Sequence, residues 1–237
     1  MIFFSTHTRS PQSEIMDDFS LQGTEMESLL TDLKRVNTLL GGIRITTNGI
    51  KMLLQYHPKD KKVRIVDVGC GDGELLRQCA LWARKNKFHF ELIGVDANPH
   101  ILKEAQARSK AYPEIEYRVL NIFSDEIKTL TIDICLCTLF LHHFKNEAII
   151  KILNNLLAQS RIGLVVNDLH RSRTAFQLFK AFSAIFIRTK IARHDGLVSV
   201  ARGFRKKDLE DLSQEIPVTK HQINWKWAFR YQWLLVK

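Results

Sequence analysis

The chain of 237 residues has few cysteines, and none of them stands at the spacing of a metal-binding or redox pair. The four cysteines occupy positions 70, 79, 135 and 137, so the sequence contains no Cys-x-x-Cys motif. Neither a zinc site nor the disulfide framework of a secreted protein is indicated. We therefore expect no metal site and a reducing, cytoplasmic environment.

Long hydrophobic runs are also missing. Residues 2–4 (IFF) are too short an apolar run for the core of a signal peptide. The Phe-rich stretch TAFQLFKAFSAIFI at 174–187 contains Lys180, and it falls short of the roughly 20 apolar residues that span a bilayer. We expect residues 1–20 to form a disordered or mobile tail and residues 21–237 to form a single domain.

Acidic residues are scarce in only one part of the chain. Residues 1–160 carry 20 Lys and Arg against 19 Asp and Glu, a net charge of +1, whereas residues 161–237 carry 15 against 6, a net charge of +9. A surplus of this kind fits a solvated basic face, an anionic membrane surface, an acidic substrate or nucleic acid.

Apolar strand patterns alternate with helical patterns over most of the chain. Helical spacing predicts an N-terminal helical cap over 24–57, and the last residues, 220–237, read as two strands joined tightly. Five apolar strands with helical crossovers indicate a parallel sheet covered on both faces. Those five strands are expected at 63–68, 90–96, 115–120, 132–139 and 161–168.

The stretch VDVGCGDGELL places a glycine-rich turn at the end of the first predicted strand, where open α/β sheets bind ligands. Asp67, Asp72 and Glu74 surround this turn. Three carboxylates would repel a pyrophosphate, but they suit a ligand with an ammonium or sulfonium group. The second strand ends in Asp96, where a carboxylate can accept hydrogen bonds from a ribose diol. A cationic group and a ribose together describe S-adenosylmethionine.

Three motifs carry a resemblance to a known family. VDVGCGDG, GVDAN (94–98) and DICLCTLFLHHF (133–144) resemble, in this order, the cofactor-site motifs of class I S-adenosylmethionine-dependent methyltransferases. The resemblance implies a Rossmann-like, seven-stranded, mainly parallel sheet with an antiparallel C-terminal hairpin. It also implies a helical lid inserted after strand five, at about 171–200, and S-adenosylmethionine as the cofactor.

The resemblance also implies which residues contact the cofactor. Asp67 would lie near the methionine ammonium, Asp96 would hold the ribose, and Asn121 stands where the family often has an aspartate beside the adenine. The full set of expected cofactor-binding residues is Asp67, Gly69, Cys70, Gly71, Asp96, Ala97, Asn121, Ile122, Cys137 and Thr138.

Narrower motifs bear on the methyl acceptor. LHHF at 141–144 is similar to methyltransferases of ubiquinone and menaquinone biosynthesis. NDLHRS (167–172) and RHDGLVSV (193–200) resemble bacterial enzymes associated with type III polyketide synthases. Both resemblances imply a small, lipophilic or aromatic acceptor and transfer to oxygen. The Phe-rich stretch would form a lid over the acceptor, or an interfacial helix on an anionic membrane.

Methyl transfer to a hydroxyl gains from a general base, and imidazole titrates near neutrality. His143 and His170 are the candidate catalytic residues because they stand at the predicted ends of strands four and five. Two other function classes remain open: an RNA or DNA methyltransferase, which the basic C-terminal third invites, and a non-catalytic cofactor-binding protein. No nucleic-acid-binding module is evident, so we expect a small-molecule partner. We expect the protein to be a monomer or a homodimer.

Overall fold

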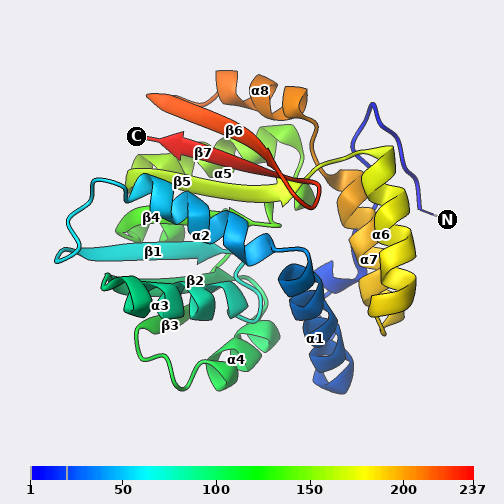
Figure 1. Cartoon of the computed structure of the whole chain (residues 1–237), viewed down its shortest axis with the longest axis horizontal. Coiled ribbons are helices and arrows are strands. Elements are labelled where there is room, and N and C mark those ends of the chain that lie inside the picture. The colour runs from blue at the N-terminus through cyan, green and yellow to red at the C-terminus, as the bar shows by residue number, and fades with distance from the viewer. Residues whose placement is uncertain (1, 20) are drawn as a thin grey trace.

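The computed structural model describes residues 2–19 and 21–237, and it contains one seven-stranded sheet (Figure 1). The strands stand in the order β3-β2-β1-β4-β5-β7-β6. Strands β1 to β5 pair in parallel, whereas β7 is antiparallel to both of its neighbours. This is the predicted sheet with its C-terminal hairpin. The strands are β1 Lys62–Val68, β2 His89–Asp96, β3 Ile115–Val119, β4 Ile132–Thr138, β5 Ser160–Leu169, β6 Lys220–Lys226 and β7 Arg230–Val236.

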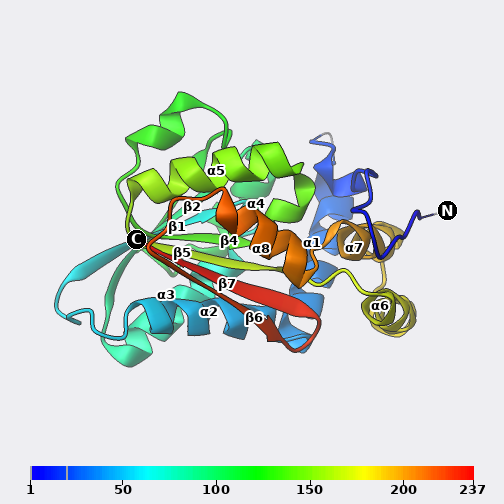
Figure 2. The ribbon, with the colours of Figure 1, turned by 90° about the horizontal axis from the view of Figure 1, so that it is seen from above.

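Helices cover both faces of the sheet, as Figure 2 shows for α2 and α3 on one side and α5 and α8 on the other. The central strands are apolar on both faces because each face is buried against helices. Four helices lie on the faces of the sheet and contribute to its two main cores. They are α2 Gly42–Leu53, α3 Glu74–Asn86, α5 Asn146–Gln159 and α8 Lys206–Gln214, and α4 Pro99–Arg108 joins the core of α2 and α3.

A second group of helices gathers beyond the end to which the parallel strands point (Figure 1). It consists of α1 Gly23–Leu39, α6 Arg173–Phe186 and α7 Lys190–Arg202. The side chains of Ser172 and Thr189 cap α6 and α7, because their hydroxyls accept hydrogen bonds from Ala175 N at 3.0 Å and Ala192 N at 3.3 Å. These two helices occupy the position of the predicted lid at about 171–200. Three short 3-10 helices, η1 Ile15–Asp17, η2 Asp125–Thr129 and η3 Leu141–His143, complete the described elements.

The N-terminal segment does not fit the expectation of a disordered or mobile tail over 1–20. Ser10 N donates to Ala201 O at 3.0 Å, so the segment is pinned to α7. Ile15 N and Met16 N each donate to the buried Asp195 carboxylate at 2.9 Å. Apolar contacts add to these hydrogen bonds, since the Phe4 ring lies 4.6 Å from the Phe176 ring and Met16 packs against the cluster of Leu29.

Candidate active site

The turn between β1 and α3 forms the floor of the site. Gly69 and Gly71 have φ angles of 67° and 53°, in the left-handed region that favours glycine. A Cβ at Gly69 would lie 2.3 Å from the Phe140 ring, so no side chain fits there. A Cβ at Gly71 would meet no atom within 4 Å, which means that the backbone at Gly71 faces open space. Gly69 N also donates to Val95 O at 2.8 Å and ties the turn to β2.

Two carboxylates lie at the ends of β1 and β2. Asp96 Oδ2 accepts from Gly71 N at 3.1 Å, and its Oδ1 accepts from Asn98 N at 3.0 Å, so the turn and the start of α4 fix its orientation. Asp67 is 3% exposed, and no described residue donates a hydrogen bond to its carboxylate. Burial, together with the nearby Asp96, raises the pKa of Asp67 well above its ordinary value. The site therefore contains a buried carboxylate that lacks a cationic partner.

The other two acids of the turn are already paired. Arg77 Nη2 lies 3.3 Å from Asp72 Oδ2 and 2.8 Å from Glu74 Oε2, and Arg108 Nη1 lies 2.9 Å from Asp72 Oδ2. Lys34 of α1 reaches Glu74 Oε2 at 3.1 Å across the site. The sequence suggested that all three acids would face a cationic ligand, but of the three, Asp67 alone lacks an ion-pair partner among the described residues.

Strand β4 and the turn after it contribute Thr138 and His143 to the wall of the site. Thr138 Oγ1 and Thr46 Oγ1 are 2.9 Å apart, which links the end of β4 to α2. His143 lies 3.0 Å from Asp17 through Nδ1 and is 20% exposed. Burial opposes ionisation of Asp17, but the His143 contact outweighs it and lowers the pKa of that carboxyl. An imidazole with one nitrogen held by a carboxylate has its other nitrogen free for proton transfer.

His142 is held between two carboxylates. Its Nδ1 lies 2.7 Å from Asp168 Oδ1 and its Nε2 lies 3.2 Å from Glu14 Oε1, and all three side chains are buried. Burial alone would lower the pKa of His142, but Asp168 and Glu14 outweigh it and raise that pKa to about 9. His142 is therefore a cation at neutral pH, and it ties the N-terminal segment to the end of β5.

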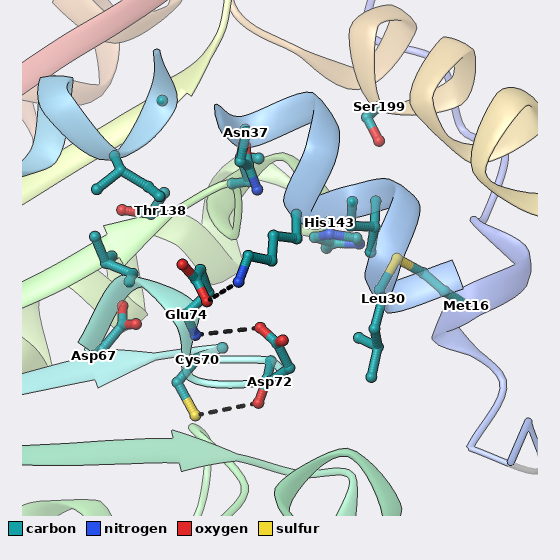
Figure 3. A pocket seen from close by; sticks show the side chains of 18 of the residues that line it. Met16, Leu30, Asn37, Asp67, Cys70, Asp72, Glu74, Thr138, His143 and Ser199 are labelled. Atoms are coloured by element: carbon teal, nitrogen blue, oxygen red, sulfur yellow. Dashed lines mark hydrogen bonds and ion pairs between the residues drawn. The ribbon is translucent and has the colours of Figure 1, made fainter. Parts of the chain in front are cut away.

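These groups surround a polar cavity of about 190 Å³ (Figure 3). Asp67, Cys70 and Thr138 lie on one side of it, and His143, Ser199 and Met16 lie on the other. Six of the residues that the sequence predicted for the site line this cavity. They are Asp67, Gly69, Cys70, Gly71, Thr138 and His143.

A second, apolar cavity of about 310 Å³ adjoins the first. Its walls come from α1, α6, α7 and the turn of the β6–β7 hairpin, and they include Phe179, Phe182, Trp227 and Phe229. The two cavities share one wall, which is made of Leu33, Asn37, Leu139, Leu169 and Ser199.

Other predicted residues are not among the described lining residues of the polar cavity, and Asp96 is one of them, although it contacts the backbone of the lining residue Gly71. Cys137 is fully buried inside β4, and Ala97 and Ile122 follow β2 and β3. Asn121 is exposed, and its Oδ1 accepts from Phe123 N at 2.9 Å instead of facing the described lining of the cavity. The adenine side of the expected site therefore stays a prediction.

His170 contacts the C-terminal hairpin. Its Nδ1 accepts from Trp225 Nε1 at 3.2 Å, its ring lies 5.1 Å from the Tyr231 ring, and burial lowers its pKa. Neither cavity includes His170 among its described lining residues. Of the two candidate bases, His143 alone is among the described lining residues of these two cavities.

Sequence reasoning missed the contribution of the N-terminal segment and of α1. Glu14 and Met16 line the polar cavity, and Asn37 lines both cavities. Ser199 also lines both, and its Oγ donates to Glu14 Oε1 at 2.7 Å. The segment around Met16 is rich in residues that form hydrogen bonds, but this composition does not indicate where the segment packs.

The described residues fit S-adenosylmethionine on two observations of the structure. The unpartnered carboxylate of Asp67 suits a cationic group in the polar cavity, and the open space at Gly71 lets a ligand approach the backbone. Asp96, held by two backbone N–H groups, keeps acceptor capacity for a diol. These features lie at the ends of β1 and β2, the edge at which open parallel α/β sheets bind their ligands.

Comparisons with known proteins agree with this fold. Residues 65–163 match a family model described as a methyltransferase domain. The structure is similar to a plantazolicin methyltransferase solved with SAH, with a TM-score of 0.66 and 15% identity, covering 90% of this chain and 93% of the other. It is also similar to magnesium protoporphyrin IX methyltransferase from Synechocystis PCC 6803, with a TM-score of 0.56 and 12% identity over 86% of each chain.

A curated relative shares a shorter part of the sequence. Carboxy-S-adenosyl-L-methionine synthase of a Nitratiruptor species is 32% identical over 93 residues, which is 38% of each chain. The match thus spans less than half the length of that relative. Residues 65–163 therefore match a methyltransferase domain, and the described chain has the fold of solved methyltransferases. The association with type III polyketide synthases stays a prediction.

Proposed function

We propose that the protein transfers a methyl group from S-adenosylmethionine to an oxygen of a small, lipophilic or aromatic acceptor. The observation that carries this proposal is the pair of adjoining cavities. One is polar and is built on the glycine turn, and the other is apolar and is lined by aromatic side chains. Because five residues line both cavities, a molecule in the apolar cavity would lie directly beside the polar one.

The residues of the polar cavity, together with Asp96 beside its glycine turn, would bind the cofactor. Asp67 would neutralise its ammonium group and Asp96 would accept hydrogen bonds from its ribose, while the backbone at Gly69 and Gly71 would make room for it. When bound, the cofactor supplies an electrophilic methyl group on a sulfonium. The fold contributes mainly alignment of the reactants and exclusion of water.

His143 is the residue that would move the proton. An acceptor hydroxyl that gains a methyl group must lose its proton, and His143 faces the polar cavity with Nδ1 on the Asp17 carboxylate. Its other nitrogen would take that proton. The apolar cavity would hold the rest of the acceptor, and Leu178 and Phe182 of α6 would act as its lid.

The proposal is tested by supplying labelled S-adenosylmethionine together with a lipid extract in one reaction and an RNA fraction in another. We expect label in the lipid extract. Label in RNA would replace the proposal with a nucleic-acid methyltransferase, and an absence of binding of S-adenosylhomocysteine in calorimetry would support a protein without methyltransferase activity.

A further inference from the structure

The apolar cavity has one charged residue in its described lining, Arg230 at the start of β7. Every other described lining residue is apolar, glycine, Asn37 or Ser199. Arg230 is 1% exposed, although a guanidinium stays charged at any physiological pH. Burying a charge costs several kcal/mol unless a partner of opposite sign compensates for it.

Arg230 lacks such a partner among the residues that the structure describes. Its Nη2 donates to Asn37 Oδ1 at 2.9 Å, while Nε and Nη1 have no hydrogen-bond acceptor. Asp168 is the acid that interacts electrostatically with Arg230, but its carboxylate is already hydrogen-bonded to His142 Nδ1 at 2.7 Å and to Leu169 N at 2.8 Å. Burial lowers the pKa of Arg230 to about 10, and Asp168 only partly opposes this.

The guanidinium lies where the two cavities meet. Its hydrogen-bond partner, Asn37, lines both of them. On the other side, a Cβ at Gly42 would lie 2.7 Å from Arg230 Nη1, so any larger residue there would push the guanidinium from its place. Gly42 itself lines the polar cavity. The Asn37 amide oxygen is neutral. An anionic oxygen in its place would form a stronger hydrogen bond to the guanidinium.

We propose that the methyl acceptor is an aromatic or fatty molecule that binds as an anion. Its ionised acidic group, such as a carboxylate, is held by Arg230 at the junction of the two cavities. The proposal rests on the proposed function of methyl transfer. The apolar walls hold the body of the acceptor, and the anionic group displaces Asn37 Oδ1 from the guanidinium. Arg230 thereby selects acids over neutral molecules of the same shape.

The test uses two fluorescent probes with the same ring system and the full-length protein saturated with S-adenosylhomocysteine. 8-Anilinonaphthalene-1-sulfonate is an anion, and N-phenyl-1-naphthylamine lacks its charge. We expect Arg230→Met to lower the affinity for the anion relative to the neutral probe by about tenfold to a hundredfold, because a charged hydrogen bond is lost. Arg173→Met, at an exposed cation on α6, is the matched control and should leave the ratio unchanged.

A second variant keeps the test decisive if Arg230→Met does not fold, which circular dichroism reports. Asn37→Ala removes the competing oxygen and retains the guanidinium, so it should raise the anion-to-neutral ratio. An unchanged ratio in Arg230→Met, or a lower ratio in Asn37→Ala, would overturn the proposal. Failure of S-adenosylhomocysteine to bind the wild-type protein would instead refute the proposed methyltransferase function, whatever the probes show.

Discussion

The polar cavity and the apolar cavity share a wall, but they are built from different parts of the chain. The polar one stands on the first strands of the sheet and on a turn in which nearly every acid is paired or buried. The apolar one is enclosed by α1, α6, α7 and the hairpin, most of which belong to the basic last third. Under the proposed function, the sheet would supply the cofactor side, and the helices and hairpin beyond it would supply the acceptor side.

The largest expected effect concerns the proton. His143→Gln should lower turnover of a phenol acceptor by about 10²- to 10⁴-fold, because a general base is typically worth that much. His170→Gln should leave turnover unchanged, since His170 bonds to Trp225 and lines neither cavity among the described residues. Steady-state kinetics of both variants would check this. Equal losses in the two variants would break the distinction drawn between the histidines.

The next effect is on stability and concerns the segment that joins the two regions. The folded pKa of His142, about 9, lies above its unfolded value, so its contribution is fully present below about pH 6.5 and is lost as the pH rises through 9. At about 1.4 kcal/mol for each unit of pKa, this contribution is about 3 kcal/mol. Denaturation by urea should show His142→Gln less stable than wild type at pH 6, with a smaller difference at pH 9.

His221→Gln is the matched control for that measurement because His221 is exposed. It should follow the pH dependence of the wild type. A difference between His142→Gln and wild type that stays constant from pH 6 to pH 9 would mean that the two carboxylates do not hold a protonated imidazole.

A similar or somewhat smaller effect is expected for the cofactor. Asp96→Ala should weaken binding of S-adenosylhomocysteine by about tenfold to a hundredfold, because a hydrogen bond to a charged acceptor is worth about 1.5 to 3 kcal/mol. Calorimetry measures this loss directly. Binding of N-phenyl-1-naphthylamine in the apolar cavity should not change. If the affinity for S-adenosylhomocysteine is that of the wild type, Asp96 does not hold the ribose.

The smallest effect tests whether the lid meets a membrane. No helix among the described residues could span a membrane, but Ile185 of α6 is 76% exposed, and Trp227 beside the apolar cavity is 68% exposed. Ile185→Asp should weaken sedimentation with anionic vesicles by about three- to tenfold, and added salt should weaken it further. Leu81→Asp on α3 is the control. Sedimentation equal for neutral and anionic vesicles would leave α6 a plain lid.

The sequence predicted the parts of the site that lie within contiguous motifs. The glycine turn, Asp67, Asp96 and Thr138 stand at strand ends, and strand ends are visible because buried parallel strands are apolar throughout. The sheet, its C-terminal hairpin and the lid position followed from the same patterns and from the resemblance. Each of these features depends on residues close together in the sequence.

The parts that sequence reasoning missed depend on contacts between distant residues. Glu14 contacts His142, which is 128 residues away in the sequence, and Asp17 likewise contacts the distant His143. Residues 2–19 have no helical or strand periodicity, so they resemble a tail until the acceptors on α7 and η3 are in place. The pairing of Asp72 and Glu74 with Arg77, Arg108 and Lys34 likewise could not be predicted from the charge pattern of the turn.

The central claim is that the apolar cavity serves the acceptor while the polar cavity serves the cofactor. A Cβ at Gly196 of α7 would lie 2.2 Å from the Phe179 ring, which lines the apolar cavity, so Gly196→Leu must crowd that cavity. The decisive measurement is transfer of label from S-adenosylmethionine to a lipid extract by Gly196→Leu, beside its affinity for S-adenosylhomocysteine. The account predicts strongly reduced transfer with unchanged affinity, and wild-type transfer by this variant would contradict it.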